Sequence, residues 1–293
     1  MNKNLALALI TAPLICACSN LASVRTFASA TSTVTNSTSL LLNDDQGTCS
    51  RRMQVEIEFY RVAKMDAAAS SAKTSESNCS VAEAQTKRIL AYNNVLENYA
   101  SALNAISQDS YVTVYGEVND VDGILSNLNS TKLTAVTNDQ KSAVEALVGF
   151  VGTAALDVYR HQKISDALSP QNVLAVKEIS AAIRSAVHAY DLQLAQEGKA
   201  YDDAINAMNV VASKESLAVQ EYSLRMSDIQ SSLAQRRQAV DAYDKALASM
   251  GTALDAAAAD VANPSFKEIS ASVISYAKQA NAVQVSFRKA FAN

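Results

Sequence analysis

The residues that could do chemistry are few in this sequence, and they do not stand at the spacings that catalysis or metal binding needs. His161 and His188 fall on different predicted helices, each without a second histidine or a cysteine at ligand spacing. Acidic residues are abundant, but on helices they are typical of solvated faces, as at Asp44-Asp45 and Asp202-Asp203. No glycine-rich phosphate loop, nucleophile elbow or metalloprotease motif is present. Although an active site can be built without a linear motif, we expect no enzyme, no catalytic residue, no metal site and no cofactor.

The N-terminal segment has the features of a leader peptide. Residues 1–17 read MNKNLALALITAPLICA, in which Lys3 supplies a positive start and an apolar core follows. That core is too short to cross a bilayer as a permanent helix. It ends in the order Ile15-Cys16-Ala17-Cys18.

This order resembles the lipobox of bacterial lipoproteins, in which an aliphatic, a variable and a small residue precede a cysteine. The resemblance covers residues 1–19 and implies cleavage before Cys18 and attachment of a diacylglyceride to its thiol. Ser19 follows where an aspartate would retain the lipoprotein in the inner membrane, so the resemblance implies the outer membrane. The alternative is an ordinary secretory leader that is cut nearby. The predicted organisation is a signal peptide at 1–17, a tether at 18–23 and a single elongated helical domain at 24–293.

Cys49 and Cys79 remain after such a leader is removed. In an oxidising envelope compartment two remaining cysteines most often pair, and a metal site would lack nearby histidines. Two free thiols are the other alternative. We predict a disulfide between Cys49 and Cys79. The first helix must then end by about residue 69, because the chain has to return to Cys49.

Composition predicts the fold class. The chain has 293 residues, 49% of them hydrophobic, but only seven glycines and three prolines. That is too few turn residues for a β protein of this length, and many of the other residues favour helices. The net charge of −4 and the lack of a basic run argue against nucleic-acid binding. We predict an all-α fold, an elongated antiparallel bundle with long coiled-coil-like helices.

One stretch, Tyr201 to Val261, predicts a long amphipathic helix of roughly 90 Å. The preceding turn is placed at Gly198; the alternative is a helix that continues through Gly198 and turns near Ser213. Arg236 interrupts the apolar stripe. It could pair with a carboxylate of a facing helix, but the favoured interpretation is a packed stem whose guanidinium reaches water.

The remaining helices are predicted from apolar periodicity and from capping residues. The second should lie antiparallel beside the Ser/Thr-rich start of the first. Ser169-Pro170 is a typical helix start. The predicted ranges are 24–64, 81–107, 120–129, 138–164, 170–198 and 264–291.

The most apolar stretch after the leader is 143–156, AVEALVGFVGTAAL. It could insert into a membrane, but its length falls short of the roughly 20 residues needed to cross one. We expect a helix buried on most sides, with Gly149 and Gly152 allowing close approach of a neighbour.

Two functions of different class follow. The first is a structural or protein-binding lipoprotein that contacts the lipid bilayer through acylated Cys18 and binds a protein of the cell envelope. The second is a membrane-active protein that resembles α-helical pore-forming toxins, for which the stretch 143–156 is the support. Lipidation argues against the second, because an anchored toxin cannot freely reach its target.

Overall fold

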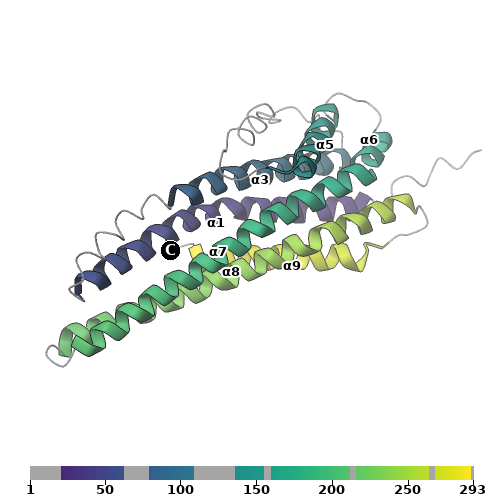
Figure 1. Ribbon diagram of the computed structural model, residues 1–293. Helices are drawn as coiled ribbons and strands as arrows, with labels where there is room; N and C mark the ends of the chain where they lie inside the picture. Colours follow the sequence, from purple (N-terminus) through teal and green to yellow (C-terminus); the bar gives the residue numbers. More distant parts are fainter. Residues whose placement is uncertain are drawn as a thin grey trace, which may run out of the picture.

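The computed structural model describes residues 21–62, 79–108, 136–154, 160–211, 216–263 and 268–291. Within these ranges every assigned element is an α-helix, and the helices pack into an elongated bundle (Figure 1). The predicted all-α class is therefore confirmed. The predicted leader and the predicted short helix at 120–129 lie outside the described residues. The helices are α1 (Leu21–Val62), α3 (Cys79–Ser107), α5 (Asn138–Ala154), α6 (Arg160–Ala167), α7 (Pro170–Val211), α8 (Ser216–Ala262) and α9 (Ala271–Phe291).

Helix α1 lies at the centre of the bundle, where it contacts α3, α7, α8 and α9. It begins at Leu21, earlier than predicted, although its first half is rich in serine and threonine. Some of these hydroxyls donate back to the carbonyl one turn earlier, as Thr31 does to Phe27 at 3.0 Å. A poor helix former is therefore held in a helix by its surroundings. The buried hydroxyl residues of α1 are Ser23, Thr31, Thr35, Ser37, Thr38 and Thr48.

Buried tyrosines from three different helices point their hydroxyls at α1. Burial raises the pKa of each far above its usual range, so the phenols stay neutral. A buried phenol needs a hydrogen-bond partner, and α1 supplies it in each case. Tyr276 of α9 pairs with Thr31 at 3.1 Å, Tyr243 of α8 with Thr38, and Tyr190 of α7 with Asp44.

The disulfide between Cys49 and Cys79 is confirmed, with Cα atoms 5.9 Å apart. It joins α1 to the first residue of α3, and the two helices run antiparallel. Asn93 of α3 donates to the carbonyl of Thr35 at 3.1 Å, which places α3 beside the Ser/Thr-rich part of α1, as predicted. Helix α1 is described as far as Val62, and the predicted limit near residue 69 lies outside the described residues.

The predicted turn at Gly198 is wrong, because α7 runs through this glycine to Val211. The chain reverses between Val211 and Ser216, where the alternative near Ser213 placed the turn. A glycine within a helix costs about 1 kcal/mol. Continuing the helix offsets this cost, because it keeps Glu197 and Tyr201 buried against the neighbouring helices. The single helix predicted over 201–261 is therefore divided, and α8 has 47 residues, about 70 Å.

The apolar stretch at 143–156 differs from its prediction in two respects. The predicted helix 138–164 is divided into α5 and α6, and α5 is buried on one side only. Its buried residues are Ala143, Val144, Leu147, Phe150 and Val151, and it packs against α7 and α3. Gly149 and Gly152 are exposed, with open space where a side chain would lie, so they do not provide close approach. No helix in the described ranges is long and apolar enough to cross a membrane.

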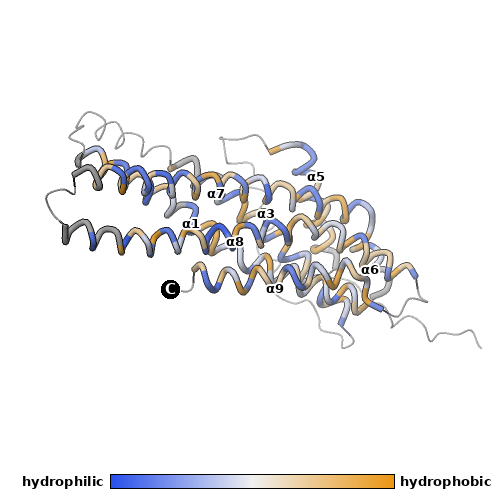
Figure 2. The backbone as a smooth tube through the Cα atoms, turned by 90° about the horizontal axis from the view of Figure 1, so that it is seen from below, coloured by the Kyte–Doolittle hydropathy of each residue, from blue (hydrophilic) through white to orange (hydrophobic). Residues whose placement is uncertain are grey.

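Helix α8 is buried over a wider arc than its sequence stripe predicts. The stripe residues Val240, Tyr243 and Leu247 are buried as expected, but Ala246, which should lie off the stripe, is fully buried as well. The reason is that α8 packs against α7, α9 and α1 at once. Figure 2 shows hydrophobic segments meeting along these helices. The last helix, α9, begins at Ala271 and not at the predicted residue 264.

Leu247 tests the phase of α8. Its side chain is 2% exposed, so Leu247→Ala should leave a cavity and lower the free energy of unfolding by about 2–5 kcal/mol. Ala248 is the neighbouring exposed position, and Ala248→Ser should cost under roughly 0.5 kcal/mol. Denaturant unfolding of both variants measures the difference, and equal midpoints would show that this face of α8 is not the buried one.

Candidate functional site

Arg236 is the point where α1, α7 and α8 meet. Its side chain is only 6% exposed, and Nη1 donates to Asp44 Oδ2 of α1 and to Glu197 Oε2 of α7, both at 3.1 Å. The favoured interpretation, a guanidinium in water, is therefore wrong. The alternative, pairing with carboxylates of facing helices, is confirmed.

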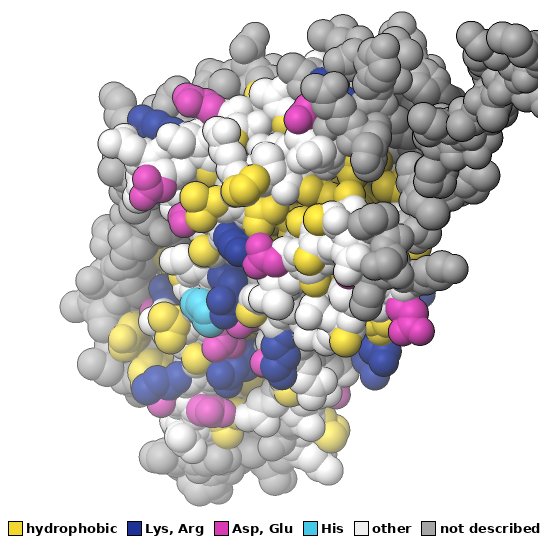
Figure 3. All heavy atoms as spheres, turned by 90° about the vertical axis from the view of Figure 1, so that its right-hand side faces the viewer, with side chains coloured by type: hydrophobic (Ala, Val, Ile, Leu, Met, Phe, Trp, Pro, Cys, Tyr) yellow, Lys and Arg dark blue, Asp and Glu magenta, His cyan; other side chains and the backbone are white. Residues whose placement is uncertain are grey.

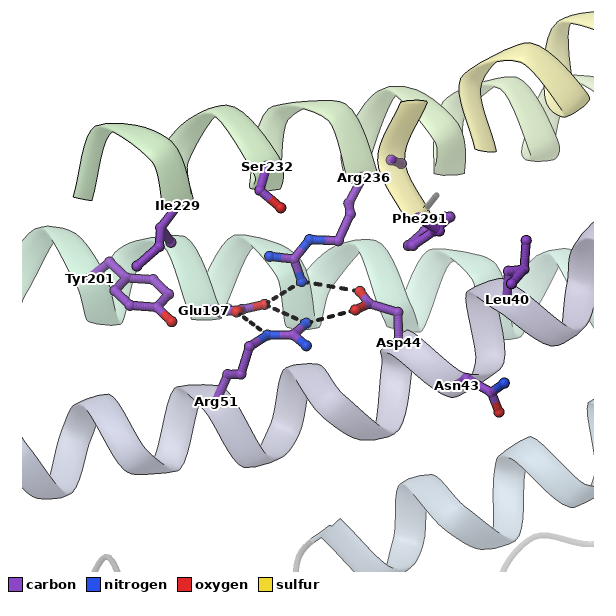
Figure 4. A pocket seen from close by; sticks show the side chains of 11 residues that line it. Leu40, Asn43, Asp44, Arg51, Glu197, Tyr201, Ile229, Ser232, Arg236 and Phe291 are labelled. Atoms are coloured by element: carbon purple, nitrogen blue, oxygen red, sulfur yellow. Dashed lines mark hydrogen bonds and ion pairs between the residues drawn. The ribbon is translucent and has the colours of Figure 1, made fainter. Parts of the chain in front are cut away.

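Arg51 of α1 completes an ion-pair cluster, which we define as Asp44, Arg51, Glu197 and Arg236 (Figure 4). Arg51 Nε donates to Glu197 Oε1 at 2.7 Å, and Nη2 donates to Asp44 Oδ1 at 3.0 Å. Glu197 is fully buried and lies between the two arginines. Two cations and two anions balance, which is the condition for burying such charges at low cost.

Gly47 leaves room for this arrangement. It lies one turn before Arg51, and a Cβ atom at Gly47 would stand 2.7 Å from Arg51 Nη1. A side chain there would require the Arg51 guanidinium to shift. The glycine therefore leaves Arg51 free to take its place between Asp44 and Glu197.

Two adjacent carboxyl groups on α1 have opposite electrostatic behaviour. Burial tends to raise the pKa of Asp44, but the hydrogen bond from Tyr190 and the charges of Arg236 and Arg51 outweigh it and hold that pKa below its usual value. Asp45 has no such partners. Its Oδ1 is buried without a hydrogen bond from any described residue, and burial, helped by the charge of Asp44, raises its pKa to about 6.

A cleft opens beside the ion-pair cluster, and we call it the α1–α8 cleft. It has a volume of about 520 Å³ and lies where α9 ends. Its polar wall is the cluster, and its rim is apolar, with Leu40 of α1 45% exposed. In Figure 4 the ring of Phe291, the last described residue of α9, stands at one end of the cleft. The other lining residues include Asn43, Tyr201, Ile229, Ser232 and Ala290.

His188 and the Asp202-Asp203 pair, which the sequence also singled out, are not among the residues that line this cleft. His188 is exposed on α7, and its Nε2 lies 3.3 Å from Asp244 Oδ1. The side chain of His161 is outside those that the structure describes. Asp202 and Asp203 form exposed polar pairs with Gln230 and Lys199. Figure 3 shows basic and acidic side chains interleaved around the histidine on that face. In the described part of the chain, no group of three or more His, Cys, Asp or Glu residues could hold a metal ion.

Sequence reasoning found Arg236 but missed its partners. Glu197 stands beside Gly198, so a turn at Gly198 puts Glu197 at the end of the predicted helix 170–198, whereas it lies well inside α7. Asp44 and Arg51 lie seven residues apart on α1 and so share one face, but Asp44 had been assigned to a solvated face. Two features of the sequence could have revealed the cluster. Gly47 lies one turn before Arg51, and Asp44 lies two turns before Arg51.

The chain matches no protein-family model, and comparisons with curated proteins and with solved structures also give no significant match.

Arg236→Met tests whether the ion-pair cluster holds the three helices together. The substitution removes one of the two cations that Asp44 and buried Glu197 share and leaves an excess negative charge in the cluster, so the free energy of unfolding should fall by about 3–5 kcal/mol. The matched control is Arg237→Met at the next position. Arg237 is 54% exposed and pairs with Asp191 at 3.2 Å, so its loss should cost under about 1 kcal/mol. Similar urea midpoints for the two variants would contradict a structural role of the cluster.

Asp45→Asn tests the unpaired carboxyl. The pKa of Asp45 is about 6 in the folded protein and about 4 when unfolded. A raised carboxyl pKa stabilises the fold at low pH, and this contribution is lost as the pH rises through about 6. The variant should therefore be more stable than the wild type by about 1–3 kcal/mol at pH 8 and equal to it near pH 4. Unfolding at both pH values measures this. Asp241→Asn, at an exposed position, is the control for the loss of a surface carboxylate.

Proposed function

We propose that the protein is an outer-membrane lipoprotein, anchored through acylated Cys18, whose helical body binds another protein of the cell envelope. The lipobox resemblance of residues 15–18 supports the anchor. Helix α1 begins at Leu21, and three extended residues span at most about 11 Å. An acylated Cys18 would therefore hold the start of α1 close to the bilayer surface.

The end of the bundle beside this anchor is tied together by one carboxylate. Asp260, near the end of α8, accepts a hydrogen bond from Ser23 of α1 at 2.5 Å. It also accepts the backbone N–H of Ser270, just before α9, at 3.1 Å. Three helix ends are thus joined next to the anchor. A force or an orientation imposed at Cys18 would pass into the whole bundle and not into α1 alone.

The α1–α8 cleft is the observation that carries the protein-binding role. Helix α9 fills the space between α1 and α8 along the part of the bundle near the anchor, and it ends at Phe291. Beyond that point α7 and α8 continue (Figures 1 and 2). The space that α9 would have occupied is the cleft, which Leu40 of α1 and Ile229 of α8 line with apolar side chains. A segment of a partner protein would bury these side chains as α9 buries its own.

The membrane-active alternative requires the apolar side of α5 to leave α7 and α3. That side is well buried, with Val144 and Leu147 fully inaccessible. We found no feature among the described residues that favours such a release, so we propose the protein-binding function alone.

A photoreactive amino acid at Leu40 or at Ser232, introduced into the protein in its own cells, tests both parts of the proposal. Both positions line the α1–α8 cleft, so both should give an adduct with the same partner. Thr252, exposed on α8 near the anchored end, is the matched control and should not give that adduct. In a variant that also carries Cys18→Ala, the adduct at Leu40 should be lost, and the protein should no longer appear in the outer-membrane fraction.

Each failure has a separate meaning. Outer-membrane fractionation that persists without Cys18 would overturn the anchor. Different adducts from Leu40 and Ser232, or the same adduct from Thr252, would overturn the cleft as the binding site.

A further inference from the structure

Helix α9 has an outer stripe that the bundle does not explain. Its inner face is buried through Val273, Tyr276, Ala280, Val283 and Phe287. On the opposite side Ile274 and Val285 are 41% and 47% exposed. Lys278 and Lys289 follow each of them by four residues, so all of these side chains share one face. We call this face the α9 outer stripe; Arg288 lies at its edge.

The α9 outer stripe is basic and has no acidic residue. Between Ala271 and Phe291 the charged residues are Lys278, Arg288 and Lys289, all exposed. No described residue forms an ion pair with any of them. The protein as a whole carries a net charge of −4, so this cationic surface is local and not a reflection of overall composition.

The neighbouring part of α1 also lacks acidic residues. Helix α1 has no acidic residue from Leu21 to Asn43, but it carries Arg25. A shallow depression between α1 and α9 is lined by Arg25 and uncharged polar residues such as Ser29, Asn104 and Gln284. Along α9 and from Leu21 to Asn43 of α1, no described residue is acidic. In Figure 2, α9 forms the edge of the bundle away from α7, so its outer side is not covered by that helix.

We propose that the α9 outer stripe rests on the surface of an anionic lipid bilayer. Lysine and arginine have long apolar stems and charged ends. Together with exposed Ile274 and Val285 on the same face, they suit the boundary between headgroups and acyl chains. Each basic residue near an anionic surface strengthens binding several-fold. Two large apolar residues give a shallow and reversible contact.

This inference rests on the proposed function in one respect. An anchor at Cys18 would keep α9 at a high effective concentration beside the bilayer, so that a weak contact is sufficient. Because α9 runs along the bundle axis for about 30 Å, its contact would lay the bundle along the membrane. The face that the bundle turns toward the lipid would then be that of α9 and the start of α1.

The test uses the full chain with Cys18→Ala, so that acylation does not contribute, and vesicles of phosphatidylcholine alone or mixed with phosphatidylglycerol. The protein should sediment with the anionic vesicles and less with the neutral ones, and added salt should weaken this binding. Lys278→Glu/Lys289→Glu should lower binding to the anionic vesicles about tenfold or more. All variants share the same N-terminal segment, so differences between them report on α9.

The matched control is Lys141→Glu/Lys199→Glu, which makes the same change in net charge at exposed positions on α5 and α7. It should bind nearly as well as the parent. Equal losses in the two double variants would mean that net charge alone matters, and this would overturn the proposal. No preference for anionic vesicles would overturn it too.

A photoreactive amino acid at Val285 in the native, acylated protein separates lipid from protein as the occupant. A lipid adduct supports the proposal, and a protein adduct in its place overturns it. Because the vesicle experiment omits the acyl anchor and does not involve the α1–α8 cleft, its failure would leave the proposed protein-binding function standing.

Discussion

The burial of Glu197 is the constraint on which the arrangement of the long helices depends. A fully buried carboxylate is tolerated only when cations and hydrogen bonds compensate it, and here Arg51 and Arg236 reach it from two other helices. Apolar side chains can pack in several registers, but this pairing requires α1, α7 and α8 to meet at particular residues. The ion-pair cluster therefore contributes specificity of register, as polar residues do in coiled coils.

The hydrogen bonds of α1 extend the same constraint along the bundle. Threonine is a poor helix former, and an isolated peptide with the sequence of α1 would have little reason to be helical. In the bundle, Thr31 and Thr38 form hydrogen bonds with the buried hydroxyls of Tyr276 and Tyr243. Asp44 accepts hydrogen bonds from both Tyr190 and Arg236. A shift of α1 by one turn would leave several buried polar groups unpaired at once, and each unpaired group would lower the free energy of unfolding.

The sequence predicts the elements of this fold well and its turns poorly. Apolar periodicity identifies α3, α7 and the buried stripe of α8 because each is a long segment with a repeating pattern. The disulfide is predicted from the oxidising compartment that the predicted leader would imply. The turn at Gly198 fails because local propensity, worth about 1 kcal/mol, is outweighed by tertiary contacts that the sequence does not display. The prediction for Arg236 fails for the same reason, because its partners Asp44 and Glu197 are far away in the chain. Glu197 lies on α7, the helix that the predicted turn ended too early.

The length of α9 connects the two surfaces that the protein offers. Phe291 in its last turn stands at the α1–α8 cleft, while Arg288 and Lys289 in the same turn lie on its outer side. If the outer side lies on lipid, the cleft is held close to the headgroups, and a partner would have to approach along the membrane plane. A longer α9 would fill the cleft, and a shorter one would uncover Tyr243, which packs against Phe287 with ring centroids 5.8 Å apart. The end of α9 thus sets where the core closes, where the cleft opens and how far the basic stripe extends.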